Sequence, residues 1–182
     1  VRQIQQEKAK QKQGAAELEY VQAINNQQYA KAETAARRML RDAESAAQPS
    51  PEQLISSIQA LGMSLLWQGK YDEAEPLYRR SVAIAERDLK PGNDGLWVSL
   101  NMLGNSLMHQ ERSLEAEPIL RKALYEAEHH LPESHPALAT SLTTLGQLYV
   151  GQKGYGRAEP LFVKSLKLAR ASGPMFRNQA VT

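Results

Sequence analysis

The stretch that decides the fold is QGKYDEAEPLY at residues 68–78, because the tripeptide Ala-Glu-Pro inside it recurs at a constant interval. The three copies begin at Ala74, Ala116 and Ala158, so each lies 42 residues after the one before. The pair Leu-Gly keeps the same step, at 61–62, 103–104 and 145–146. A fixed period of this size is typical of stacked repeat proteins, which offer long surfaces to partners and seldom carry out chemistry themselves.

Each repeat is predicted to form two helices joined by a short turn. The first is an uncharged stretch in which apolar residues recur at helical spacing, and the second carries most of the charge. The first helices are predicted at about 53–68, 95–110 and 136–151, and the second helices at about 71–89, 113–130 and 155–171. A degenerate earlier copy is marked by Tyr29 and Ala32-Glu33, which lie 42 residues before Tyr71 and Ala74-Glu75. The sequence therefore predicts an all-α protein of four helix hairpins.

This pattern of small and large apolar residues resembles the tetratricopeptide repeat, and the long unit is similar to the kinesin light chain type. Residues 68–78 carry the resemblance, together with the joint at 131–136 and the residues Ala139–Leu142 after it. The resemblance implies a right-handed α-α superhelix, a solenoid of four hairpins in which the first helix of each pair lines a concave groove. The implied segments are a linker or frayed helix at 1–13, a repeat domain at 14–173 with repeats at about 14–51, 52–93, 94–135 and 136–173, and a C-terminal tail or start of a truncated repeat at 174–182.

Six small residues are expected to set the packing within the hairpins. They are Gly62, Gly104, Gly146, Ala74, Ala116 and Ala158. Glycine inside a helix costs about 1 kcal/mol relative to alanine, so glycines kept at one register indicate a close approach of two helices. We expect each alanine to face the glycine of its own repeat, and the large residues Tyr78, Leu120 and Phe162 to fill the wider space one turn on.

The first helices are also the expected binding surface, because the stretches predicted for them contain no Asp, Glu, Lys or Arg. Amide side chains both donate and accept hydrogen bonds, and Met or Leu can hold an apolar anchor. The candidate groove residues are Ser56, Gln59, Met63, Leu66, Val98, Asn101, Asn105, Met108, Thr140, Thr143, Gln147 and Val150. The alternative interpretation is that these polar residues only solvate a helix face.

The pattern favours a non-catalytic scaffold or adaptor that binds a peptide segment of a protein partner. The alternative is a regulatory or sensor domain of a larger enzyme or transcription regulator. Some tetratricopeptide proteins hold a partner's C-terminal carboxylate with Lys and Arg in the groove. Such a clamp is not expected, since the matching positions Gln59, Met102, Thr140 and Thr144 are neutral.

Sites for other kinds of ligand find little support in the sequence. The formal net charge of +2, from 22 basic and 20 acidic residues, argues against a nucleic-acid binder. There is no cysteine, and His129, His130 and His135 lack the spacing and the carboxylates of a metal site. No phosphate loop or nucleophile–base set is visible. We therefore expect no enzyme activity, no cofactor, no metal and no small-molecule substrate.

Compartment and assembly state are left open by the sequence. The longest uncharged runs, such as 53–69, are too polar to span a bilayer. A cytoplasmic location is favoured, and the alternative is a periplasmic or exported protein after removal of a signal. An apolar C-terminal end of the array would be covered by further repeats, by Met175 and Phe176 folding back, or by a second copy, so a monomer or a weak homodimer through that end is expected.

Overall fold

The computed structural model describes the backbone of residues 2–171 and the side chains of residues 14–171. Over this part of the chain, the regular secondary structure is helical throughout. The helices are α1 (Arg2–Asn25), α2 (Tyr29–Glu44), α3 (Pro51–Leu66), α4 (Tyr71–Asp88), α5 (Asp94–His109), α6 (Ser113–His130), α7 (Pro136–Gly151) and α8 (Tyr155–Ala171). Residues 2–13, predicted as a linker or frayed helix, form the first half of α1, and the tail predicted at 174–182 lies outside the described residues.

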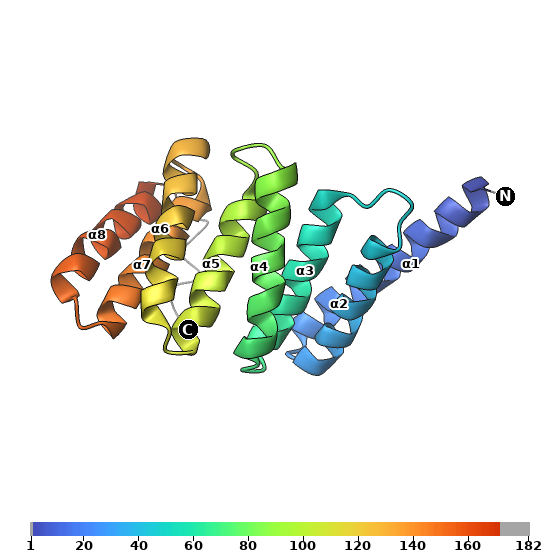
Figure 1. The fold of residues 1–182 in the computed structure, drawn as a ribbon, viewed down its shortest axis with the longest axis horizontal. Helices are drawn as coiled ribbons and strands as arrows, with labels where there is room; N and C mark the ends of the chain where they lie inside the picture. The colour runs from blue at the N-terminus through green and yellow to red at the C-terminus, as the bar shows by residue number, and fades with distance from the viewer. Residues whose placement is uncertain (1, 172–182) are drawn as a thin grey trace. The chain divides into compact units, whose positions relative to one another are not determined.

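The helices form two compact units, Val1–Leu89 and Lys90–Thr182. In the first unit α1 pairs with α2 and α3 pairs with α4, and α2 packs against α3 (Figure 1). In the second unit α5 pairs with α6 and α7 pairs with α8, and α7 packs against both α5 and α6. The predicted all-α class and the four hairpins are confirmed.

The helices α3, α5 and α7 each begin with a side-chain cap from the joint that precedes them. The Ser50 hydroxyl accepts a hydrogen bond from the Gln53 backbone N–H at 3.4 Å, and Asn93 Oδ1 accepts from Gly95 N–H at 2.8 Å. His135 Nδ1 accepts from the Ala137 N–H at 3.2 Å. Side chains at this position satisfy amide groups that have no partner inside the helix. Because α3 and α5 begin slightly earlier than predicted, their first turns include the acidic residues Glu52 and Asp94.

The three glycines that recur at the 42-residue step each lie against the large residue in the second helix of the same hairpin. A Cβ added to Gly62 would lie 2.6 Å from the Tyr78 ring, and one added to Gly104 would lie 2.3 Å from Leu120. The same construction at Gly146 meets the Phe162 ring at 2.9 Å. The atoms nearest to each glycine therefore belong to the large residue, which was expected to lie one turn further on. The alanines Ala74, Ala116 and Ala158 are themselves buried one turn earlier in the second helices.

The turn inside each hairpin contains one residue in the left-handed region of backbone conformation. The φ angles are 55° at Gln27, 73° at Gly69, 60° at Glu111 and 59° at Lys153. These four positions are equivalent in the 42-residue register, and only one of them is glycine. Residues with a Cβ adopt this conformation at a cost of about 1–2 kcal/mol.

Replacement of Lys153 by glycine is therefore expected to raise the free energy of unfolding by about 0.5–1 kcal/mol, because glycine removes the local strain. Lys153 is exposed, so little else is lost. Urea unfolding of the variant measures the change, and Gly69→Ala should shift stability by a similar amount in the opposite direction. A less stable Lys153→Gly protein would contradict this account of the turn.

Candidate functional site

The residues predicted to bind a partner in the first unit lie along one stripe of α3. Ser56 is exposed, and Gln59, Met63 and Leu66 are half-buried. Their spacing of three or four residues places them on one side of the helix. Trp67, directly after the helix, is 43% exposed and extends the stripe with a large aromatic side chain.

In the second unit, Asn101 does not lie on the surface as predicted. Its side chain is 1% exposed, and Nδ2 donates to the Ser141 hydroxyl and to the Trp97 carbonyl, each at 3.0 Å. Ser141 lies on α7, so this amide joins α5 to α7 inside the unit. The prediction that Asn101 contacts a partner is wrong, because the side chain is already used in the contact between two repeats.

Thr143 also makes internal contacts. Its hydroxyl donates to the Ala139 carbonyl at 2.9 Å and lies 2.9 Å from the Ser165 hydroxyl on α8. It therefore contributes to packing within its hairpin. Met102 follows Asn101 in the sequence, and Thr144 follows Thr143. Both side chains are half-buried and continue the surface stripes of α5 and α7. Helical spacing from Val98 would have indicated position 102, since residues four apart share a face.

The surface left by these corrections is called here the α5–α7 surface. It consists of Val98, Met102, Asn105 and Met108 from α5 and of Thr140, Thr144, Gln147 and Val150 from α7. All of these side chains are half-buried or exposed, and none is ionisable. Asn105 and Gln147 occupy equivalent positions on the two helices, and within the described residues neither side-chain amide has a hydrogen-bond partner.

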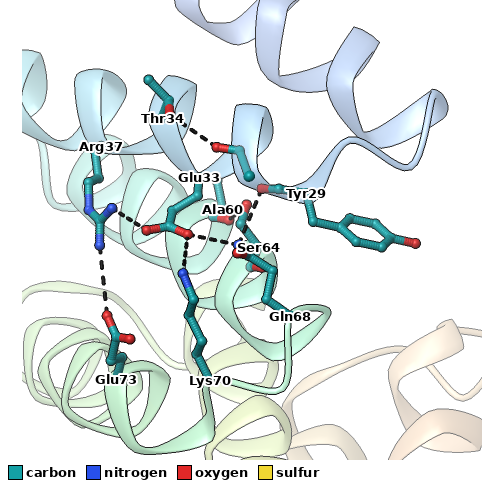
Figure 2. A network of polar contacts seen from close by, with 10 residues as sticks. Tyr29, Glu33, Thr34, Arg37, Ala60, Ser64, Gln68, Lys70 and Glu73 are labelled. Atoms are coloured by element: carbon teal, nitrogen blue, oxygen red, sulfur yellow. Dashed lines mark hydrogen bonds and ion pairs between the residues drawn. The ribbon is translucent and has the colours of Figure 1, made fainter.

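A polar cluster at the joint between the first two hairpins was not predicted (Figure 2). The buried carboxylate of Glu33 accepts a hydrogen bond from Gln68 Nε2 at 2.8 Å. It also forms an ion pair with Lys70 Nζ at 2.9 Å. Arg37, one turn along α2, also pairs with Glu33. Burial acts to raise the pKa of Glu33, but the hydrogen bonds from Lys70 and Gln68 and the charge of Arg37 outweigh it and lower the pKa.

The equivalent glutamate in the second unit does the same with different donors. Glu117 accepts a hydrogen bond from the Tyr149 hydroxyl at 3.0 Å, and it pairs with Arg121 at 3.1 Å and Arg157 at 3.6 Å. The Arg157 guanidinium lies 4.1 Å from the centre of the Tyr149 ring. At these two joints the equivalent glutamates, Glu33 and Glu117, therefore bind the following hairpin and contribute to stacking the repeats.

The histidines of the predicted cluster have separate structural contacts. His129 stacks on Tyr125 with ring centroids 4.0 Å apart, and His130 lies 3.6 Å from a carboxylate oxygen of Glu126. His135 caps α7. In the described part of the chain, no three His, Asp or Glu side chains are placed to share a metal ion. Among the same residues, no helix combines the length and the apolar character needed to cross a membrane.

Two of the hollows in the described part of the chain lie outside α3 and α5, and the second of them reaches the predicted groove residue Val150 at the end of α7, the third predicted groove helix. One, of about 390 Å³, lies on α1 and α2 in the first unit. Its lining includes Glu19, Gln22, Asn26, Gln28, Lys31 and Arg38. The other, of about 330 Å³, lies on α8 and the end of α7 in the second unit. It is lined by Val150, Tyr155, Ala158, Glu159, Phe162 and Val163.

Comparison with known proteins relates this sequence and fold to one family. A family model described as tetratricopeptide repeat matches residues 54–124 and 96–171. The structure resembles BtubC (BKLC) from P. vanneervenii, with a TM-score of 0.74, 20% identity, and coverage of 84% of this chain and 60% of that one. It also resembles the apo form of RapI, with a TM-score of 0.78, 18% identity, and coverage of 89% of this chain and 57% of that one.

A third similar structure contains kinesin light chain-like repeats from Podosopora anserina that are nearly identical to one another. Its TM-score is 0.72 at 17% identity, with coverage of 92% of this chain and 77% of that one. These identities are low, so the similarity is one of fold. This chain spans about 60% of the length of the BtubC and RapI structures. No protein of curated function matches the sequence.

Proposed function

Because the chain belongs to the tetratricopeptide repeat family, we propose that it is a scaffold or adaptor that binds a peptide segment of a protein partner. The family is generally non-catalytic, and its members bind protein partners. The observation that carries the proposal is the pair of exposed or half-buried amides on the α5–α7 surface, Asn105 and Gln147, which no described residue hydrogen-bonds.

The chemistry of the α5–α7 surface suits a neutral, extended peptide. A side-chain amide can donate to a peptide carbonyl and accept from a peptide N–H, so Asn105 and Gln147 match backbone groups in either chain direction. Met102, Met108 and Val150 offer apolar contact, and methionine adapts to side chains of different shape. Since the surface has no ionisable side chain, strongly charged partner segments would gain little from it.

The stripe on α3 is proposed to bind in the same manner within the first unit. Ser56 and Gln59 are polar, and Met63 and Leu66 are apolar, which repeats the combination found on α5 and α7. Trp67 adds an exposed aromatic side chain of the kind that is enriched where binding energy is concentrated.

Replacement of Asn105 or Gln147 by alanine is expected to weaken binding of a peptide selected on the intact chain. Peptides would be selected from a random library on the immobilised protein, and their affinity measured by calorimetry. Each substitution should raise Kd by about five- to tenfold, as expected for the loss of about 1 kcal/mol or slightly more of hydrogen bonding.

Leu114→Ala is the matched control, since Leu114 is exposed on α6 in the same unit and lies away from the α5–α7 surface. It should leave Kd unchanged. Far-UV circular dichroism would check that all variants are folded. If Asn105→Ala and Gln147→Ala both bind like the wild type while remaining folded, the proposed surface is not the binding site.

A further inference from the structure

The outer side of α8 exposes an apolar face at the C-terminal end of the second unit. Tyr155 is 64% exposed, Val163 46% and Leu166 51%. The hollow of about 330 Å³ next to them is lined almost entirely by apolar side chains. Exposed apolar groups gathered in one place are unusual unless something covers them.

The repeat register shows which contacts this face is built to make. Leu166 lies 42 residues after Leu124, which packs against the buried cluster that joins α6 to α7. Glu159 is equivalent to Glu33 and Glu117, and both of those carboxylates accept hydrogen bonds from the following hairpin. Within the described residues, Glu159 itself has no partner. The face therefore combines exposed apolar side chains with a carboxylate that has no donor.

A second copy stacked head to tail would bring the face at α1 and α2 against this one. The hollow on that face is lined mainly by polar and charged side chains, among them Glu19, Gln22, Gln28, Lys31 and Arg38, with the exposed Leu18 and Val21 nearby on α1. Covering Tyr155 and the other apolar groups of α8 with the charged members of this set would bury charge against apolar surface, which is unfavourable.

The chain beyond α8 contains the complementary groups in the order required. Met175 and Phe176 are large and apolar, and Arg177 follows them directly. An extended chain advances about 3.3 Å per residue and a helix about 1.5 Å, so residues 172–177 could span at most about 20 Å, and the helix from Ala171 back to Glu159 spans about 18 Å. A segment returning along α8 is therefore just long enough for Arg177 to approach Glu159.

We propose that Met175, Phe176 and Arg177 bind this face of the same chain, with the two apolar side chains against Val163 and its neighbours and Arg177 paired with Glu159. The segment supplies to α8 the kinds of group, apolar cover and a cationic donor, that the following hairpin supplies to Glu33 and Glu117 and their neighbours. This inference does not rest on peptide binding at the α5–α7 surface, but the two proposed surfaces share Val150, which also lines the hollow.

Disulfide trapping tests the proposal, because these 182 residues contain no cysteine. The test variant carries Gly156→Cys and Asn178→Cys in the full chain. A side chain at Gly156 meets no atom within 4 Å, and helical spacing places it on the same side of α8 as Glu159 and Val163. The matched control adds Met175→Ser and Phe176→Ser to the test variant, so that the two cysteines and the length of chain between them are unchanged and only the apolar side chains differ. Both variants keep Arg177.

Mild oxidation at several protein concentrations, followed by non-reducing electrophoresis, gives the rates at which disulfides form within one chain and between two chains. The disulfide within one chain should form at least about tenfold faster in the test variant than in the control, because docking raises the local concentration of the two thiols. Adding Arg177→Gln should reduce this advantage by about two- to fivefold, the range expected for an exposed ion pair.

Equal rates in the two variants would overturn the proposal. A disulfide between two chains that increases with protein concentration would also overturn it, and would assign the face to a second copy. An unchanged rate on adding Arg177→Gln would overturn the pairing with Glu159.

Discussion

Replacement of Gly62 by alanine is expected to lower the free energy of unfolding by about 2 kcal/mol, although alanine is the better helix former. The added Cβ would lie 2.6 Å from Cζ of Tyr78 and 2.9 Å from its hydroxyl oxygen. The Tyr78 side chain is fully buried, so the ring has no free space into which to move. Alanine gains about 1 kcal/mol in helix propensity, and the cost of forcing two packed helices apart exceeds that gain.

Gly156 provides the matched control, because it lies within α8 and an added Cβ meets no atom within 4 Å. Gly156→Ala is expected to raise the free energy of unfolding by about 0.5–1 kcal/mol. Chemical unfolding of both variants, followed by circular dichroism, would show effects of opposite sign. If Gly62→Ala were as stable as the wild type, the contact with Tyr78 would not be the reason that glycine is needed.

The pairing of helices could be predicted because the 42-residue step repeats a small residue in each of the two helices of a hairpin, which indicates a close approach between them. Which residue meets the glycine could not be predicted. Ala74 and Tyr78 are one turn apart on the same side of α4, so helical spacing does not distinguish them. Only the shift of one helix along the other decides, and that shift is a property of tertiary packing.

The surface residues were predictable only in part for a similar reason. The repeat register makes Gln59, Asn101 and Thr143 equivalent. The structure gives Asn101 a partner on the neighbouring helix α7, and gives Thr143 a partner on α8. A side chain at the border of a helix stripe turns inward where a hydroxyl lies within reach, and the period alone does not show where that occurs.

The role of the motif glutamate was missed because its partners are distant in sequence and differ between joints. Glu33 binds an amide and an ammonium group, whereas Glu117 binds a phenol and guanidinium groups. Their common feature is that they donate hydrogen bonds. A search for identical residues at the repeat period does not detect a shared function of this kind.

Replacement of Glu33 by glutamine is expected to lower the free energy of unfolding at pH 7 by about 2–3 kcal/mol. The carboxylate is buried and receives hydrogen bonds from Gln68 and Lys70 of the next hairpin as well as from Arg37 (Figure 2). Hydrogen bonds to a charged group contribute about 1.5–3 kcal/mol, and glutamine keeps the shape of the side chain while removing the charge. The variant therefore reports on charge and not on packing.

The same network predicts how stability depends on pH. The folded-state pKa of Glu33 is lowered below that of the unfolded chain, so its contribution is fully present above the unfolded pKa and is lost as the pH falls through the folded pKa. The unfolded value is about 4.3. The difference in stability between wild type and Glu33→Gln should therefore be constant from about pH 7 to pH 5 and shrink below about pH 4.

Glu44→Gln is the control that separates a buried network from an ordinary surface pair. Glu44 pairs with Arg80 between the same two hairpins, but both side chains are more than 40% exposed, so its loss should change stability by less than about 0.5 kcal/mol. Urea unfolding of the three proteins between pH 3 and pH 7 makes the comparison. A difference for Glu33→Gln that persists unchanged at pH 3 would contradict this account, because a carboxylate whose pKa is lowered by folding must lose part of its contribution to stability once the pH is below the unfolded pKa.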